Sequence, residues 1–326
     1  MKLLMWIFCL IIFVSHGEGE GTWQVGVRMV LDNKYQTLFL EYHRNQNASL
    51  DVYLQTFLNS ANLFFRDIKN RSIEFVLVGT YNMTLNESSA LLSNKRSTEE
   101  YLYELHEFGI KHNFPSDDLV FLLYPYQLTE IDEFQTSFFD GFCNTRGYGF
   151  GYDDARTFSG VTMAARQFAR LLGANADNIA GCKDGTFLMA NNRSSPDKHT
   201  LSDCSKRNIE RKLETINNCS CLRTGYSGPV NSTYLPSDFL NETDICTLSH
   251  QNYTFCNQLG RKSKEAYVVG CSVACCEMGP QNTQNLYGIL APDGTTSDDC
   301  QLCLAGQCTN KTVTSSSSTA GSAVEN

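Results

Sequence analysis

Residues 160–177 read Gly-Val-Thr-Met-Ala-Ala-Arg-Gln-Phe-Ala-Arg-Leu-Leu-Gly-Ala-Asn-Ala-Asp and form the most informative part of the chain. Their apolar residues recur at intervals of three and four, which predicts one helix with a buried stripe. The stripe consists of Val161, Ala164, Ala165, Phe168, Leu171 and Leu172. Gly173 follows where a left-handed residue would end the helix. Arg166 and Arg170, one turn apart, also fit the polar face of an ordinary amphipathic helix.

The first residues of the chain are typical of a secretory signal. Lys2 precedes an apolar run from Leu3 to Val14, and Ser15 and Gly17 are small residues that suit cleavage. The run is about a dozen residues long, whereas a membrane span needs about 20. We therefore expect residues 1–17 to be a signal peptide and the rest to be secreted into the extracellular space without a membrane anchor.

The cysteines and glycosylation motifs agree with this compartment. Thirteen of the 14 cysteines follow the signal, which predicts disulfide bonds and leaves an odd cysteine that is free or forms an intermolecular bond. Ten asparagines occupy Asn-x-Ser/Thr motifs. They are Asn47, Asn70, Asn82, Asn86, Asn192, Asn218, Asn231, Asn241, Asn252 and Asn310. We expect a cysteine-rich, disulfide-bonded glycoprotein.

The net charge of -9 argues against nucleic acid or an anionic membrane as the main partner. Apolar patterns predict strands over 24–31 and 73–81 and within 118–128, and helices over 50–68 and 98–112. Ser97 and Thr98 are candidate caps for the second helix. Residues 141–152, rich in glycine and aromatic side chains, are expected to form a loop. Strands that alternate with helices predict an α/β domain.

The pattern changes near Cys219. Beyond the central helix, residues 202–205 are expected to cap a helix through about Thr215. From Cys219, long periodic segments end and cysteines become dense, which predicts a small module held by disulfides rather than by its own core. The expected organisation is a domain over 18–222, a cysteine-rich module over 223–312 and a disordered Ser/Thr-rich tail over 313–326.

These features together resemble the reprolysin (adamalysin) family of secreted metzincins, which includes snake-venom and arthropod salivary metalloproteases. The resemblance rests on motifs in order along most of the chain. They are the strand ending at Asp32, Asn59-Ser60-Ala61-Asn62, the strand after Asp118, Cys143, Thr162-Met163-Ala164, Leu171-Leu172-Gly173-Ala174, Asp177, Met189, Ser202-Asp203-Cys204-Ser205, and Asp293-Gly294-Thr295 with the cysteines around it. The resemblance implies a metzincin-like domain with a mixed sheet packed with helices, followed by a disulfide-rich module.

The metzincin signature H-E-x-x-H-x-x-G-x-x-H supplies three histidine ligands to zinc and a glutamate general base. With Gly173 as its glycine, the ligand positions carry Arg166, Arg170 and Ala176, and the general-base position carries Gln167. Arginine stays protonated and offers no lone pair, and alanine has no donor atom. Glutamine has no carboxylate to accept a proton from water. We expect no zinc, no other cofactor and no catalytic residue.

The resemblance also implies pairings and roles for other residues. Cys182 is expected to bridge Cys204, and Cys143 to bridge either Cys219 or Cys221. Met189 takes the position of the family's Met-turn, where it can serve as a core-filling thioether.

No second catalytic site is evident. The histidines His43, His106, His112, His199 and His250 lack metal-ligand spacing and are expected to be scattered over the surface. No Gly-x-Ser-x-Gly nucleophile elbow occurs.

The expected function is that of a secreted pseudoprotease that binds an extracellular or host plasma protein, or sequesters a substrate of active relatives. The cleft that the resemblance implies is expected to stay concave, and the family's cysteine-rich regions are associated with partner recognition. In one version, Arg166 and Arg170 bind an acidic group, unless Asp153 or Asp154 neutralises them. The alternative is an active zinc metalloendopeptidase, which similarity over the whole domain would imply.

Overall fold

The computed structural model describes residues 22–44, 48–69, 72–92, 97–116, 118–126, 128, 131–178, 187–190, 200–216, 221–222, 232–249, 253–256, 268–269, 271–277, 286–296 and 301–309. The predicted signal peptide and the Ser/Thr-rich tail lie outside these ranges. Within them, no helix combines the length and the apolar character needed to span a bilayer.

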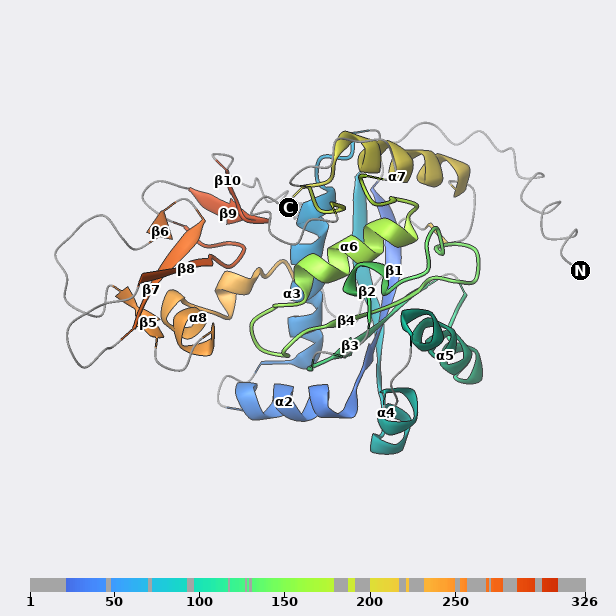
Figure 1. The fold of residues 1–326 in the computed structure, drawn as a ribbon, viewed down its shortest axis with the longest axis horizontal. Helices are drawn as coiled ribbons and strands as arrows, with labels where there is room; N and C mark the ends of the chain where they lie inside the picture. The colour runs from blue at the N-terminus through green and yellow to red at the C-terminus, as the bar shows by residue number, and fades with distance from the viewer. Residues whose placement is uncertain are drawn as a thin grey trace, which may run out of the picture.

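A four-stranded parallel sheet forms the centre of the main domain (Figure 1). Its strands are β1 (Trp23–Leu31), β2 (Ile73–Asn82), β3 (Leu119–Tyr124) and β4 (Tyr148–Tyr152), in the order β2-β1-β3-β4. All three strand pairs are parallel. A mixed sheet was expected. Among the described residues, the antiparallel contact of this sheet is an isolated bridge between Ser137 and Gly149.

Strand β4 corrects the expectation of a loop over residues 141–152. A side chain on Gly149 or Gly151 would place its Cβ within 3.2 Å or 3.0 Å of the Phe121 ring on the neighbouring strand. The glycines are therefore used to admit a large aromatic ring, and pairing with β3 compensates for their weak strand propensity.

Helices cover both faces of the sheet. Alternate side chains of β1 and β3 face a core formed with α3 (Leu50–Asn62), α6 (Val161–Leu171) and α7 (Asp203–Ile216). The opposite side chains, together with β4, pack against α4 (Leu85–Leu92) and α5 (Thr98–Lys111). This arrangement confirms the predicted α/β layering. Gly173 confirms the predicted end of α6, because its φ angle is +86°.

Two helices of the main domain were not expected from the sequence pattern. Asp32, predicted only to end the first strand, caps α2 (Asn33–His43) by accepting hydrogen bonds from the backbone of Lys34 and Tyr35. The second is α4. Helix α3 is shorter than predicted, since it passes at Asn62 into the 3₁₀ turn η1 (Leu63–Phe65).

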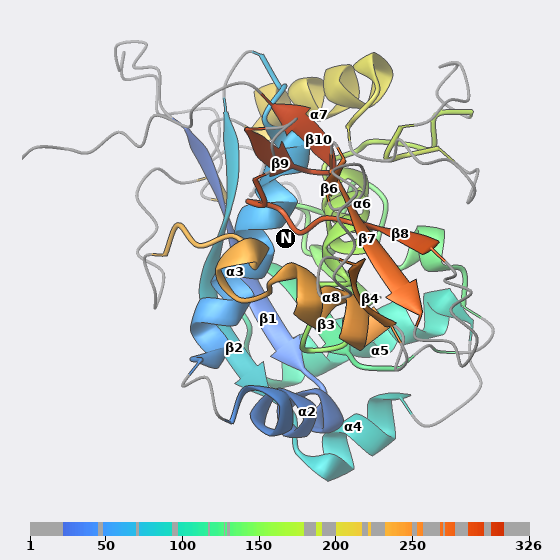
Figure 2. The same ribbon diagram turned by 90° about the vertical axis from the view of Figure 1, so that its left-hand side faces the viewer.

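The C-terminal module consists of short elements. They are η3 (Pro236–Asp238), α8 (Glu242–Ser249), β5 (Tyr253–Phe255), β6 (Val268–Val269), β7 (Ser272–Glu277), β8 (Leu286–Leu290), β9 (Leu302–Leu304) and β10 (Gln307–Thr309). Strands β5, β6 and β8 pair with β7, and β9 pairs with β10. Figure 2 looks from the side of this module, which lies in front of α3.

The module is joined to the main domain by packing as well as by hydrogen bonds. Leu240 and Ile245 belong to the core of the main domain. Asn59 of α3 donates from Nδ2 to the carbonyls of Ser232 and Tyr234, at 2.8 and 2.9 Å. Arg66 donates to the carbonyl of Leu304 at 3.2 Å. The expectation of a module held by bridges alone is therefore incomplete.

All cysteines among the described residues form disulfides. The bonds whose two partners are described are Cys143–Cys221, Cys246–Cys275, Cys256–Cys276 and Cys271–Cys303. The first selects Cys221 over Cys219. Cys204 is disulfide-bonded, but the predicted partner Cys182 lies outside the described residues. The odd cysteine is therefore not among the described ones.

Candidate functional site

Helix α6 carries Arg166, Gln167 and Arg170, which the resemblance places at positions of the zinc signature. Its apolar stripe packs on α3 and on the sheet, where the Phe168 ring stacks on Phe75 of β2 at 4.7 Å. Arg166 and Gln167 are also buried, so neither belongs to a solvent-exposed face of an ordinary amphipathic helix.

Arg166 is almost completely enclosed, with 4% of its surface exposed. Its Nη1 donates to the backbone carbonyls of Leu188 and Ala190, at 2.6 and 2.9 Å. The ring of Phe134 covers the guanidinium at 4.2 Å from the ring centroid, within the range of a cation–π contact. The cation therefore lies between the turn that holds Met189 and an aromatic lid.

The surroundings of Arg166 change its acidity. Burial lowers the pKa of Arg166 to about 10, while Asp177 and Asp132 act in the opposite direction and Arg170 adds to the lowering. The side chain therefore remains charged near neutral pH. Its Nε has no hydrogen-bond partner and is buried, so the charge is incompletely satisfied.

Gln167 is fully buried and belongs to an internal network. Ser137 donates from Oγ to the Gln167 side-chain oxygen at 2.8 Å, and the Gln167 amide nitrogen lies 3.4 Å from the sulfur of Met163. The amide oxygen already has a donor, and its atoms do not face solvent. Gln167 thus has a structural role in a position that the resemblance assigns to a general base.

Arg170 and Ala176 are less buried. Arg170 donates from Nε to the carbonyl of Ser137 at 3.1 Å, and its guanidinium lies 5.6 Å from the ring of Phe139. Burial lowers the pKa of Arg170, and Asp132 opposes this change. Ala176 contributes only its backbone N–H, which donates to the side chain of Asn175.

Asp177, Met189 and Ser202 are separated in the sequence but are joined by hydrogen bonds in the structure. Met189 is buried and its carbonyl accepts from the backbone N–H of Asp177 at 3.2 Å. The Asp177 carboxylate accepts from the hydroxyls of Ser202 and Ser205, at 2.5 and 3.2 Å. Asp177 thereby links the Met189 turn to the start of α7, and three separate motifs of the sequence form one structural unit.

The residues at the signature positions do not fit a zinc ion. Arg166 and Arg170 offer donors where a metal requires lone pairs, and Ala176 offers no side-chain ligand. In the part of the chain that the structure describes, no three His, Cys, Asp or Glu side chains lie close enough to hold a metal.

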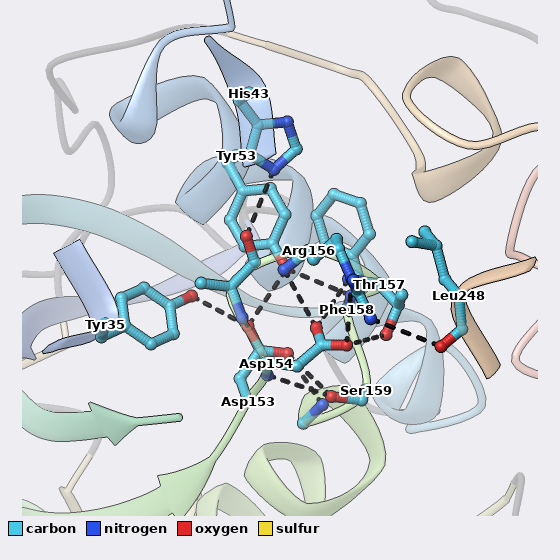
Figure 3. A network of polar contacts seen from close by, with 12 residues as sticks. Tyr35, His43, Tyr53, Asp153, Asp154, Arg156, Thr157, Phe158, Ser159 and Leu248 are labelled. Atoms are coloured by element: carbon cyan, nitrogen blue, oxygen red, sulfur yellow. Dashed lines mark hydrogen bonds and ion pairs between the residues drawn. The ribbon is translucent and has the colours of Figure 1, made fainter. Parts of the chain in front are cut away.

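Asp153 and Asp154, which the sequence offered as partners of the arginines, have other roles. The hydroxyls of Tyr35 and Tyr53 donate to the Asp153 carboxylate at 2.8 and 3.0 Å. Both contacts are drawn in Figure 3. The backbone N–H groups of Ala155 and Gly160 also donate to this carboxylate. Burial and the charge of Asp154 raise the pKa of Asp153 to about 6, and the donors oppose the rise.

Asp154 stabilises the loop that precedes α6. Its side chain accepts from the backbone of Arg156 and Thr157 and from the Thr157 hydroxyl (Figure 3). Arg156 in turn donates to the carbonyl of Leu248 in the C-terminal module, at 3.3 Å. The Asp153–Asp154 pair therefore positions α6 and the module and does not neutralise Arg166 or Arg170.

The described histidines are not scattered over the surface, which corrects that expectation. His43 is buried, packs on Phe39 at 4.5 Å and lies 3.2 Å from the carbonyl of Ala155. His106 and His112 of the α5 region are partly buried against aromatic rings, at 5.1 Å from Tyr148 and 4.7 Å from Tyr81. His199 and His250 lie outside the described residues.

Sequence reasoning missed the residues that close the site. Phe134 and Ser137 come from the segment around η2 (Glu133–Gln135), which has no motif or periodicity that would reveal its contact with α6. The expected concave cleft is therefore absent over Arg166 among the described residues. A cavity is found farther along α6, next to Arg170.

Comparison with known proteins does not identify a family. No family model and no curated protein matches the chain. One solved structure that matches is the "Structure of a chaperone-substrate complex", with 11% sequence identity and a TM-score of 0.39. The match covers 60% of this chain and 35% of that chain, so this protein spans about a third of its length. A likeness at this level carries no argument about function.

Proposed function

We propose that this protein is a secreted, catalytically inactive relative of the reprolysin metzincins, without zinc, that acts by binding an extracellular protein such as a host plasma protein. One observation carries the proposal. A buried guanidinium, that of Arg166, occupies a position to which the resemblance assigns a zinc ligand, and it is hydrogen-bonded to both carbonyls that flank Met189. A metal ion beside this cation would be repelled and would lack ligands.

The disulfides and exposed glycosylation motifs support the proposed location. Three of the ten motif asparagines, Asn82, Asn86 and Asn241, are described, and all three are exposed. The remaining seven lie outside the described residues. A secreted glycoprotein should lose mass on treatment with an N-glycosidase, and these three asparagines are expected to be among the occupied ones.

The alternative, an active zinc metalloendopeptidase, makes opposite predictions about metal and cleavage. We would measure zinc in the purified full chain and incubate it with casein and fibrinogen, with and without a chelator. The expected result is no bound zinc and no chelator-sensitive cleavage. Stoichiometric zinc together with chelator-sensitive cleavage would overturn the proposal.

A variant with restored ligands tests the register of the resemblance. Arg166→His, Gln167→Glu, Arg170→His and Ala176→His together recreate the metzincin signature. The folded fourfold variant is expected to bind zinc, and Gln167→Glu alone is the matched control that should not. Failure of the folded variant to bind zinc would mean that the motif has been aligned to the wrong family.

A further inference from the structure

A cavity of about 470 Å³ opens beside the enclosed Arg166 site, between the first turns of α5 and the segment that precedes β4. Cavities of roughly 300–1,000 Å³ are typical of ligand sites. Its lining includes Thr98, Tyr103, Asp132, Phe139, Arg146 and Arg170. Arg170, at the last turn of α6, therefore lines this cavity, whereas Arg166 does not.

Two arginines in this cavity have no carboxylate partner among the described residues. Neither Arg146 nor Arg170 forms an ion pair within the described parts of the chain. Each guanidinium instead lies over an aromatic ring at 5.6 Å, Arg146 over Phe138 and Arg170 over Phe139. A stacked guanidinium keeps its N–H groups at its edge, where they can donate to a carboxylate in a two-point contact.

Glu99 and Asp132 are the acidic residues in the lining of the cavity, and Asp132, which acts on Arg170, already has hydrogen-bond donors. Asp132 accepts from the backbone N–H of Phe134 at 3.0 Å and from the side chain of Gln135 at 2.8 Å. It therefore holds the η2 turn. Burial also lowers the pKa of Arg170, and Asp132 opposes this change without forming an ion pair with Arg170 in the part of the chain that the structure describes. A carboxylate from a ligand would form such an ion pair.

The wall of the cavity is aromatic as well as cationic. Tyr103 and Phe139 are among the exposed large apolar side chains, with 44% and 47% of their surfaces exposed. Exposed aromatic and arginine side chains that share one concave site are the residue types that contribute most to protein–protein binding. An apolar neighbour of the bound carboxylate would cover them.

We propose that this cavity is the site at which the protein binds its partner, through an aspartate or glutamate side chain flanked by an apolar residue. Arg146 and Arg170 bind the carboxylate, and Tyr103 and Phe139 contact the apolar neighbour. The inference rests on the proposed binding function and gives it a location and a ligand chemistry. Arg146 takes the place of Arg166 in the expected pair of carboxylate-binding arginines. Arg166 is enclosed, and its Nη1 already donates to two backbone carbonyls.

The test uses two blocked tetrapeptides, acetyl-Ala-Phe-Glu-Ala-amide and its glutamine counterpart, which differ only in charge. Their binding to the full, disulfide-bonded chain is measured by saturation-transfer NMR and titration. The glutamate peptide is expected to bind, and the glutamine peptide to bind about tenfold more weakly or not at all. Arg146→Ala and Arg170→Ala should each weaken binding of the glutamate peptide by about tenfold.

Arg44→Ala is the matched control, because Arg44 is an exposed arginine at the end of α2, outside the lining of the cavity. It should bind the glutamate peptide like the unmodified protein. Arg146 is exposed, so Arg146→Ala carries the test if Arg170→Ala does not fold. Equal binding of both peptides, binding unaffected by Arg146→Ala, or no binding of the glutamate peptide would overturn this site. None of these results depends on zinc content, which tests the proposed function separately.

Discussion

Replacement of Arg166 by methionine would show whether the buried guanidinium stabilises the Met189 turn. Methionine keeps much of the volume and can contact the Phe134 ring through its sulfur, but it cannot donate a hydrogen bond. The carbonyls of Leu188 and Ala190 would then lose their Nη1 partner. Because each unsatisfied buried group costs about 1–3 kcal/mol, this loss alone destabilises the fold by roughly 2–6 kcal/mol.

Relief of the buried charge opposes that loss. The fall in the pKa of Arg166 from 12.5 to about 10 corresponds to roughly 3 kcal/mol by which the site disfavours the charged form. Loss of the cation–π contact with Phe134 destabilises the folded state by about 1 kcal/mol. The free energy of unfolding of Arg166→Met is therefore expected to be lower than that of the unmodified protein by about 2 kcal/mol.

Urea denaturation with the disulfides intact measures this difference. Arg170→Met is the matched control. Within the described residues, Arg170 makes one side-chain hydrogen bond, through Nε, and it is only partly buried, so we expect its replacement to cost less than about 1 kcal/mol. The reasoning would be refuted if Arg166→Met were as stable as the unmodified protein, or if Arg170→Met were the more destabilised variant.

Three further predictions follow from the packing around the site. Tyr53→Phe removes one donor from the Asp153 carboxylate and should lower the free energy of unfolding in urea by about 1–3 kcal/mol; an unchanged value would contradict the assigned hydrogen bond. Burial raises the pKa of Asp293 from 3.8 to about 6, so the folded state holds this proton more tightly than the unfolded state and loses stability as pH rises. Asp293 should account for a loss of about 1–3 kcal/mol between those two pH values, so Asp293→Asn should show a smaller pH dependence and keep only the contribution of groups such as Asp153, whereas parallel pH profiles would count against it. Peptide mapping without reduction should recover Cys143 joined to Cys221, whose removal should cost about 2–4 kcal/mol, and recovery of Cys143 with another cysteine would show the assignment to be wrong.

The elements with a clear period were predictable from the sequence. The strand ending at Asp32, the helix beginning at Leu50 and the end of α6 at Gly173 were placed within a few residues. Each depends on local signals, namely apolar spacing, a short polar side chain at a boundary, or a residue that tolerates positive φ. Tertiary contacts do not alter these local signals, so the predictions for these three boundaries were confirmed.

The sequence-based predictions that were wrong or incomplete have a common physical cause. Gly149 lies in a strand because the Phe121 ring on β3 requires the space that a side chain would take, and nothing near Gly149 in the sequence indicates this ring. Phe134 covers Arg166 although 32 positions separate them in the printed sequence. Similarly, Arg146 and Arg170 share a cavity through the fold and not through any spacing. Contacts between distant segments therefore determined which residues of the motif are accessible.

At Arg166 the side chain donates hydrogen bonds and the backbone accepts them. Under the proposed function, this arrangement affects how easily catalysis could be regained. A zinc site needs side chains that present lone pairs to a cation, whereas here the cation is itself a side chain and the surrounding backbone carbonyls accept from it. Arg166→His would remove a donor from these carbonyls while Arg170 and Ala176 still offered no ligand. A single reversion would thus reduce stability without creating a metal site, and only simultaneous changes could restore one. Under the proposed function, the enclosed cation would therefore hinder a stepwise return to catalysis.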